Sequence, residues 1–354
     1  MAQPLVLKPV ALTCGEPAGI GPEIAAHARK ALGASLPFFW IGDPRHLPTG
    51  CDFQLIEHPA QAKSVGAGTL PVLNHPFSGP ATPGTANPAH AADVIAVIAR
   101  AVALVQADEA SAICTAPIHK KALKDGAGFA FPGHTEYLAA LGGVDRVVMM
   151  LACPELRVVP VTVHIPLAEV AQSLTAEALQ ETIRITHAGL IRDFGLTAPR
   201  IAVAGLNPHA GEGGAMGHED ITLITPILEQ LRREGMQIAG PLPADTMFHA
   251  AARARYDVAV CMYHDQALIP IKTIDFAGGV NLTLGLPFVR TSPDHGTAFD
   301  IAGRGIADPT SLIAALRMAW DMSCARQAAG GVTPPAPPVR YLNQDEKGTG
   351  DGSD

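Results

Sequence analysis

The sequence has 354 residues, of which 48% are apolar, and this is enough for about two domains with buried cores. Its 25 Lys and Arg residues against 33 Asp and Glu residues give a formal charge of −8, so no basic field would attract nucleic acid or an anionic membrane. The most apolar long window, residues 91–107, is interrupted by Asp93 and Arg100, and the N-terminus lacks a signal-peptide pattern, so we expect neither a membrane span nor secretion.

Apolar runs typical of buried strands alternate along the chain with longer segments of helical period. Strands are expected within residues 4–13, 37–43, 110–117, 145–153, 157–167, 199–208 and 257–265. Helices are expected within residues 22–32, 87–106, 175–195, 224–235 and 311–323. This alternation predicts an α/β fold with a mainly parallel sheet. From residue 328 onward Gly, Pro and charged residues dominate, which predicts a disordered tail over residues 328–354.

A glycine-rich segment, residues 13–24, follows the first expected strand. Its glycines allow a ligand to approach the backbone, and Pro22 suits the first turn of a helix, whose free N–H groups attract anions. The segment matches neither the G-x-G-x-x-G pattern nor the P-loop lysine pattern. Two interpretations stay open: a tight turn between strand and helix, or a loop that binds a ligand.

Three histidines, His164, His209 and His264, each follow a strong strand signal. Because the carboxyl ends of parallel strands share one edge of a sheet, the three imidazoles can meet at one site. Imidazoles suit a divalent transition metal that keeps open positions for substrate oxygens. Asp245 and Asp265 are candidate catalytic carboxylates that could bind the metal, orient an imidazole or move a proton, and helix capping is their alternative role. A single histidine is more often an ordinary surface or core residue.

Two further segments predict an anion-binding site. His134 and Thr135 precede a helix-like segment, so a hydroxyl and free N–H groups would point at a negative group, although such a Thr could equally begin a structural capping box. Lys272, Asn281 and Arg290 lie close together in otherwise weakly charged sequence. Cations with apolar flanks need an anionic partner, so these residues are predicted to bind a phosphate or a carboxylate, with surface salt bridges as the alternative.

Together these segments resemble the PdxA family, the 4-hydroxythreonine-4-phosphate dehydrogenases of vitamin B6 synthesis. The resemblance covers roughly residues 8–325. It is carried by the strings GEPAGIGPEI, TAPIHK, FPGHTE, GLNPHAGEGG, GPLPADT, MYHDQ and GVNLTLGLPFVRTSPDHGTAFDIAGRG. The segment 294–309 is also similar to the loop with which isocitrate and isopropylmalate dehydrogenases bind the adenosine half of their cofactor, so NAD is implied without the G-x-G-x-x-G pattern.

The resemblance implies a two-lobed α/β/α fold like that of isocitrate and isopropylmalate dehydrogenases. By analogy, residues 1–125 with 285–327 would form the cofactor-side lobe, and residues 126–284 the lobe for metal, substrate and dimerisation. The cofactor, NAD or NADP, would be bound by Asp294, His295, Gly296, Thr297, Asp300 and Gly303. Arg304 is a candidate partner for the additional phosphate of NADP.

The resemblance also implies the remaining ligands. One divalent metal (zinc, cobalt, manganese or magnesium) would bind His164, His209 and His264. The substrate would bind His134, Thr135, Lys272, Asn281 and Arg290. The enzyme would be a homodimer with the active site at the subunit interface, and one of the metal-binding histidines, by resemblance His264, would come from the partner subunit.

The implied reaction is oxidation of 4-phosphooxy-L-threonine by hydride transfer to the cofactor, followed by decarboxylation to 3-amino-2-oxopropyl phosphate. Related dehydrogenases act instead on phosphorylated four-carbon sugar acids or on aromatic cis-dihydrodiols, and these are the alternatives within the family. Phosphate acyltransferases share the broad architecture but need no redox cofactor, and the segment 294–308 with the three histidines disfavours them. The six cysteines are scattered without a C-x-x-C pair, which favours the reducing cytoplasm.

Overall fold

The computed structural model describes residues 7–330. The tail predicted to be disordered, residues 328–354, lies outside the described residues from 331 onward. Residue 328 itself is still helical, because it is the last residue of α10 (Thr310–Ala328).

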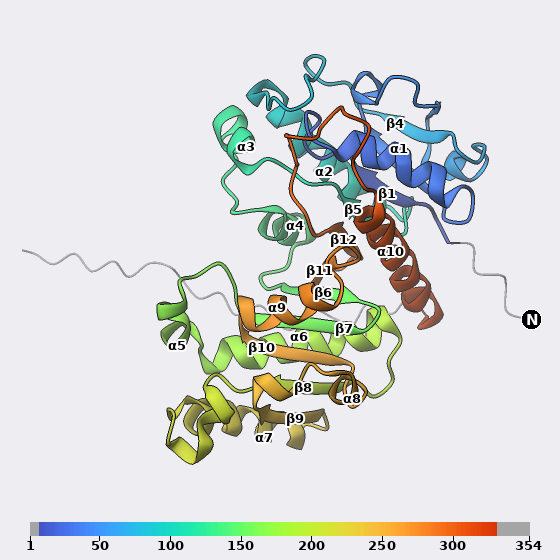
Figure 1. Cartoon of the computed structure of the whole chain (residues 1–354). Coiled ribbons are helices and arrows are strands. Elements are labelled where there is room, and N and C mark those ends of the chain that lie inside the picture. Colours follow the sequence, from blue (N-terminus) through green and yellow to red (C-terminus); the bar gives the residue numbers. More distant parts are fainter. Residues whose placement is uncertain (1–6, 331–354) are drawn as a thin grey trace, which may run out of the picture.

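The described strands form one 12-stranded sheet that passes through two lobes (Figure 1). The first lobe holds the strands β3 (Phe53–Ile56), β4 (Leu70–Asn74), β2 (Phe38–Gly42), β1 (Val10–Thr13), β5 (Ile113–Thr115) and β12 (Arg290–Pro293), in that order across the sheet. The second lobe continues with β11 (Val280–Leu284), β6 (Val148–Cys153), β7 (Leu156–Thr162), β10 (Val258–Tyr263), β8 (Arg200–Ala204) and β9 (Gln237–Leu242).

The antiparallel pairs of the sheet follow one another, from the last strand of the first lobe to the third strand of the second lobe. The pairs β12–β11, β11–β6 and β6–β7 are antiparallel, and all other neighbours are parallel. The predicted α/β fold with two lobes and a mainly parallel sheet is therefore confirmed. The lobe boundaries stay a prediction, because one sheet runs through both lobes and the expected breaks near residues 125 and 285 fall at α3 and in the turn between β11 and β12.

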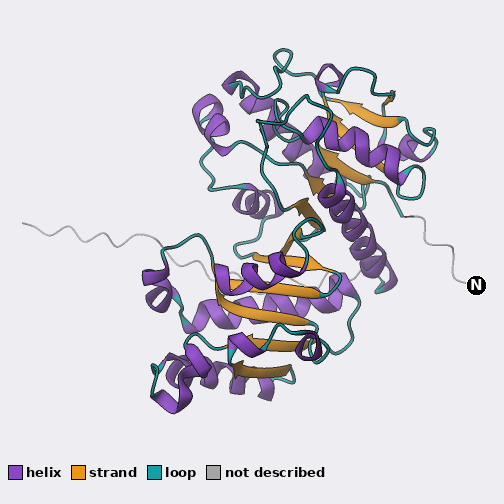
Figure 2. Cartoon of the chain, in the orientation of Figure 1, coloured by secondary structure: helices purple, strands orange, loops and turns teal. Residues whose placement is uncertain are grey.

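Helices cover the sheet in both lobes (Figure 2). They are α1 (Gly21–Leu32), α2 (Ala91–Gln106), α3 (Lys120–Ala127), α4 (His134–Gly142), α5 (Val170–Ser173), α6 (Ala176–Phe194), α7 (Thr225–Arg233), α8 (Ala250–Arg253), α9 (His264–Ile274) and α10. Between these layers β1 and β2 are buried along their whole length, with Phe38, Phe39 and Trp40 at their centre. Burying one such large apolar side chain contributes roughly 1.5–3 kcal/mol, so the continuous apolar runs of the sequence become the core strands.

One helical stretch of the described residues, Pro88–Gln106, is long and apolar enough to cross a membrane by length and composition alone. A core helix passes the same test. In this fold α2 turns Val94, Val97 and Ile98 toward the interior, where the helix packs against β1 and β5.

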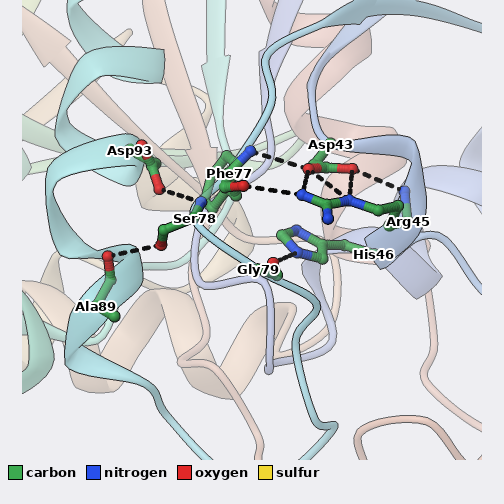
Figure 3. Close-up of polar contacts among 8 residues, drawn as sticks. All are labelled: Asp43, Arg45, His46, Phe77, Ser78, Gly79, Ala89 and Asp93. Carbon is green, nitrogen blue, oxygen red and sulfur yellow. Dashed lines mark hydrogen bonds and ion pairs between the residues drawn. The ribbon is translucent and has the colours of Figure 1, made fainter.

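The segment that follows β4 is held to the end of β2 by a buried carboxylate (Figure 3). Asp43 accepts hydrogen bonds from the Arg45 guanidinium and from the Phe77 N–H at 2.9 Å. Burial acts to raise the pKa of Asp43, but these hydrogen bonds prevail and hold that pKa well below its usual range. Asp93 accepts from the Ser78 N–H at 2.9 Å, so both carboxylates fix the same loop.

Candidate active site

Two polar pockets lie at the edge of the sheet where parallel strands end. The histidine pocket, a cavity of about 590 Å³, includes Thr162, His164, Asp245, His264, Asp265 and Gln266. The arginine pocket, a cavity of about 410 Å³, includes Thr115, Lys120, His134, Asn281, Arg290 and the residues Asp294, His295 and Gly296. In open α/β sheets, ligands bind at this edge.

The histidine pocket brings two predicted metal ligands and both predicted catalytic carboxylates together. His164 follows β7, and His264 follows β10 as the first residue of α9, so the two rings stand 5.7 Å apart between centroids. The Nδ1 atom of His264 lies 2.7 Å from Oδ1 of Asp265. Asp245 lines the same pocket. Within this one chain His264 already lies beside His164.

Backbone conformation and one amide fix the floor of this pocket. His164 has a φ of 54°, in the left-handed region that costs energy for a residue with a side chain and that is often found at functional sites. The buried amide of Gln266 accepts from the Met262 N–H at 2.7 Å and donates to the Gly205 carbonyl at 2.8 Å. These two bonds tie the end of β10 to the end of β8.

His209 does not line the histidine pocket. It is exposed in an irregular loop after β8, where residues 209–213 all have positive φ. Asp220 holds that loop by accepting from the N–H groups of Leu206 at 2.9 Å and Asn207 at 3.1 Å. No group of three or more His, Cys, Asp or Glu side chains within residues 7–330 is arranged to hold a metal ion. The three-histidine site therefore stays a prediction.

Arg290 is the central cation of the arginine pocket. It is 4% exposed, and every hydrogen bond it makes within the described chain goes to a neutral oxygen. Thr115 Oγ1 accepts from Nε at 3.2 Å and from Nη2 at 2.8 Å, and Thr283 Oγ1 accepts from Nη1 at 3.1 Å. Burial lowers the pKa of Arg290 to about 10, so the guanidinium is still charged at neutral pH. A buried cation held only by neutral partners favours an anionic ligand.

His134 faces this cation from the start of α4. The helix has Gly133 as its N-cap and no side-chain capping bond, so the predicted Thr135 segment forms no capping box. His134 Nε2 is shielded from solvent and has no hydrogen-bond partner among residues 7–330. Burial, together with the charges of Arg290 and Lys120, lowers the pKa of His134 well below its usual value, so the ring is neutral. Thr135 lies one residue further along α4 and does not line the pocket.

Of the other two predicted substrate residues, Asn281 contacts Arg290, whereas Lys272 contacts Asp294. Asn281 lines the arginine pocket, and its Oδ1 accepts from Arg290 at 3.4 Å. Lys272, near the end of α9, forms an ion pair with Asp294 and donates to the Asp294 carbonyl at 3.2 Å. Because α9 begins at His264 in the histidine pocket, this one helix connects the two pockets.

The predicted cofactor residues do not all lie in one place. Asp294, His295 and Gly296 line the arginine pocket, whereas Thr297 and Gly303 are held by their backbones against the start of α1. The Thr297 carbonyl accepts from the Ile20 N–H at 3.0 Å, and the Glu23 carboxylate accepts from the N–H groups of Gly303 at 3.2 Å and Ala307 at 2.9 Å. Asp300 and Arg304 are exposed.

The glycine-rich segment is the buried support of this loop. Residues 13–24 are buried, and a Cβ on Gly19 would lie 2.8 Å from the Thr297 carbonyl oxygen. Gly15 has a φ of +67°, and a Cβ there would lie 2.4 Å from the Pro117 carbonyl. These glycines let three backbone segments pack against one another. Of the two interpretations left open by the sequence, the structure therefore favours the tight turn.

Sequence reasoning missed three residues of the site region. Thr115 and Lys120 belong to the string TAPIHK at the end of a strong strand signal, which could have identified them. The sequence did not indicate a role for Glu23 in the site, because acidic residues are common in the first turn of a helix.

The fold and its two pockets show that this is a two-lobed α/β protein with polar ligand pockets at the carboxyl ends of its strands. The family model for the pyridoxal phosphate biosynthetic protein PdxA matches residues 35–319. The chain therefore belongs to the PdxA family and is a dehydrogenase.

Individual relatives agree. The 4-hydroxythreonine-4-phosphate dehydrogenase of Ruegeria sp. (strain TM1040) is 63% identical over 318 residues, which cover 90% of this chain and 98% of the relative. The crystal structure of 4-hydroxythreonine-4-phosphate dehydrogenase from Klebsiella pneumoniae matches with a TM-score of 0.82 and 39% identity, over 89% of this chain and 99% of that one. A terephthalate 1,2-cis-dihydrodiol dehydrogenase from Burkholderia xenovorans LB400 matches less well, with a TM-score of 0.63 and 29% identity over 89% of this chain and 98% of that chain.

Proposed function

We propose that this chain oxidises the secondary alcohol of 4-phosphooxy-L-threonine with NAD or NADP, and that the resulting β-keto acid loses carbon dioxide to give 3-amino-2-oxopropyl phosphate. The observation that carries this proposal is Arg290, a buried guanidinium with only neutral partners in the described chain. Family membership supports the same reaction, because the two more similar relatives named above are 4-hydroxythreonine-4-phosphate dehydrogenases.

Binding of the substrate is assigned to the arginine pocket. Arg290 would bind its phosphate or carboxylate, with His134 supplying a neutral imidazole that donates or accepts a hydrogen bond. Asn281 would be a third anchor in this pocket, and Thr135 and Lys272, which do not line it in this structure, are kept as proposed anchors of the same substrate. Holding a charged end of the substrate restricts its rotational freedom, and this is how such anchors accelerate the transfer that follows.

The donors of the histidine pocket fit a divalent metal, since imidazole nitrogens and carboxylate oxygens are the ligands that zinc, cobalt and manganese accept. His164 and His264 would hold the ion together with His209, and magnesium remains a fourth candidate. Such an ion supplies Lewis-acid stabilisation of negative charge on oxygen. Asp265 would orient the His264 ring through Nδ1, which leaves Nε2 free for binding.

Proton transfer is assigned to Asp245. It lines the histidine pocket and makes no side-chain hydrogen bond or ion pair within residues 7–330, so its carboxylate is free to accept the alcohol proton. Asp265 is already engaged with His264 and serves better as an orienting group. The cofactor would supply the hydride acceptor, and the residues that would hold it are Asp294, His295, Gly296, Thr297, Asp300 and Gly303.

A homodimer with the active site at its interface belongs to the same proposal. Leu167 is 72% exposed and Ile269 64% exposed, and both line the histidine pocket. Exposed apolar side chains at the rim of a polar pocket are typical of a surface that another chain covers. Light scattering on the purified protein tests this, and a monomer at working concentration would contradict it. A cytoplasmic location is proposed as well, supported by six cysteines that are all unpaired in the described chain.

The test mixes the purified protein with NAD or NADP, a divalent metal and 4-phosphooxy-L-threonine, and follows the absorbance of the reduced cofactor. Mass spectrometry should find 3-amino-2-oxopropyl phosphate, and chelation should stop turnover. Faster turnover of a phosphorylated four-carbon sugar acid or of a cis-dihydrodiol would favour the alternative dehydrogenases. Acyl transfer to phosphate without cofactor reduction would contradict the proposal.

The metal assignment is tested separately by His209→Ala. We expect this variant to keep its fold, because His209 is exposed, and to lose metal-dependent turnover. Calorimetric titration with zinc and a circular dichroism spectrum are the two measurements. Unchanged zinc affinity and activity would remove His209 from the set of ligands.

A further inference from the structure

Lys120 is a cation of the arginine pocket that the proposed substrate anchors leave out. It begins α3 immediately after the segment that leaves β5, and it lines the same cavity as Arg290 and His134. Its Nζ atom lies 3.3 Å from the position that a Cβ on Gly133 would occupy, so the ammonium group lies against the N-terminus of α4.

The neighbouring lysine shows what an ordinary surface lysine does in this helix. Lys121 forms an ion pair with Asp125 one turn away, at 2.5 Å. No carboxylate within residues 7–330 forms an ion pair with Lys120, although Glu136 lies close, with Oε2 3.5 Å from the same Cβ position on Gly133. Two adjacent lysines of one helix therefore differ: one is neutralised by its own helix, and the other borders a pocket.

Two cations converge on the imidazole of His134. The charges of both Arg290 and Lys120 act on this ring, whose buried Nε2 lacks a partner in the described chain. The N–H groups at the start of α4 add positive potential at the same place. Arg290 is a rigid planar fork held by two threonines, whereas Lys120 is a mobile point charge on a flexible stem.

We propose that Lys120 is the second cation of this anion site and that, with Arg290, it makes the pocket select a dianionic phosphoryl group over a monoanionic carboxylate. This inference rests on the proposed anchoring role of Arg290. A single buried guanidinium matches one negative charge, and a second cation at the pocket mouth favours a ligand that carries two. Lys120 therefore determines which end of the substrate enters the arginine pocket.

The test compares Lys120→Met, which keeps the stem but removes the charge, with Lys120→Arg and with the matched control Lys121→Met. The first measurement is calorimetric titration of each free protein with inorganic phosphate, and with acetate as the monoanion. We expect Lys120→Met to bind phosphate roughly ten- to a hundredfold more weakly, as for one lost charge-assisted bond, with little change for acetate. Lys120→Arg should recover most of the affinity, and Lys121→Met should match the unaltered protein.

The second measurement separates selectivity from a structural effect. Inorganic phosphate is mostly a monoanion at about pH 5.5 and mostly a dianion at about pH 7.5, so the unaltered protein should bind it more weakly at the lower pH, and Lys120→Met should lose most of that difference. With 4-phosphooxy-L-threonine, Lys120→Met should raise KM more than it lowers kcat, because a lost charge on the bound phosphoryl group weakens binding in the ground state as well as in the transition state.

The outcomes separate this inference from the proposed function. If the unaltered protein binds phosphate but turns over no 4-phosphooxy-L-threonine, the proposed reaction fails while the titrations still decide the role of Lys120. Equal phosphate affinity in Lys120→Met and Lys121→Met would overturn the inference even in an active enzyme. So would the absence of phosphate binding by the unaltered protein, or an equal loss for acetate and phosphate.

Discussion

At the scale of single residues, the arginine pocket depends on neutral hydrogen-bond acceptors that orient a buried charged side chain. Arg290 keeps its charge in a buried place because hydroxyl oxygens satisfy most of its donors. The sequence predicted that Arg290 would seek an anion, since its flanks are apolar. It could not predict that Thr115, 175 positions away, is the acceptor that orients the guanidinium, because only the pairing of β12 with β5 brings the two together.

Replacing Thr115 with Val tests that orientation. The exchange keeps the shape of the side chain but leaves two donors of Arg290 without their acceptor. We expect a loss of about 1–3 kcal/mol in the free energy of unfolding and a higher KM for the phosphorylated substrate, because the guanidinium is no longer fixed. Urea unfolding and steady-state kinetics are the measurements. Thr115→Ser keeps the hydroxyl and should stay near the unaltered protein, so equal behaviour of the Val and Ser variants would contradict the argument.

The three predicted metal-binding histidines show a second way in which a sequence pattern fails to predict a site. Strand ends predicted that His164 and His264 could meet, and their rings are neighbours. The same rule does not bring His209 to them within the described chain, because five positions separate it from the end of β8 and residues 209–213 turn through left-handed conformations. The position of a strand end therefore does not predict where a side chain lies after such a loop.

At the scale of elements, the long helices were predictable from the sequence, whereas β11 and β12, the strands where the two lobes meet, were not. The expected helices at 22–32, 87–106 and 175–195 correspond to α1, α2 and α6, since a helical period persists over many residues. β11 and β12 are short and follow each other through a tight turn, and their polar residues Asn281 and Arg290 hide the strand signal. Apolar runs do not show whether neighbouring strands are parallel or antiparallel. The antiparallel pairs at the centre of the sheet are therefore known only from the structure.

The packing of the cofactor segment on α1 gives a prediction for Glu23→Gln. The carboxylate accepts from two N–H groups of the loop, whereas an amide would present its own N–H₂ to one of them. We expect KM for NAD to rise about tenfold, as for one lost hydrogen bond to a charged group, while KM for the phosphorylated substrate changes little. Initial-rate kinetics with each substrate varied in turn will show the split. An equal change in both KM values, or a loss of kcat alone, would count against a positioning role for Glu23.

The loop that follows β4 gives a pH-dependent prediction. His90 is 1% exposed, and burial, together with the charge of nearby His46, lowers its pKa against the opposing effect of Asp93. In the unfolded chain the imidazole takes up a proton near its ordinary value of about 6.5, but in the folded chain it does so only at lower pH. The folded state is therefore fully stabilised above about pH 6.5 and loses stability as the pH falls below it.

His90 can take up at most one proton, so the free energy of unfolding can fall by at most about 1.4 kcal/mol for each pH unit through this residue. His90→Phe fills a similar volume and cannot be protonated, so we expect the unfolding free energy of this variant to depend less steeply on pH between about 6.5 and 5. Urea unfolding at several pH values measures both slopes. His58→Phe, at an exposed position, is the control, and an identical slope in the His90 variant and the control would refute the assignment.

At the scale of the whole molecule, the two lobes are joined by strands, by the ion pair of Lys272 with Asp294, and by a buried ionic contact between α6 and α10. α10 of the first lobe packs against α6 of the second, and Arg326 forms an ion pair with Asp193 at 2.5 Å. Asp193 is 1% exposed and also receives Arg192, while Arg326 donates to the Pro287 carbonyl at 2.9 Å. Burial lowers the pKa of Arg326, and Asp193 opposes that effect. α10 also packs against β12 and β11, and α6 packs against β11 and β6, so this helix pair covers the centre of the sheet.

Asp193→Asn removes the charge that compensates Arg326 and keeps the size of the side chain. Removing one partner of a buried pair leaves the other uncompensated, so we expect the free energy of unfolding to fall by about 3 kcal/mol or more. Asp125→Asn breaks the exposed ion pair with Lys121 and should cost less than about 1 kcal/mol. Urea unfolding followed by circular dichroism gives both values. Equal stabilities of the two variants would show that the contact between α6 and α10 adds no more than an exposed ion pair, whereas a large loss confined to Asp193→Asn would show that this contact stabilises the two-lobed fold.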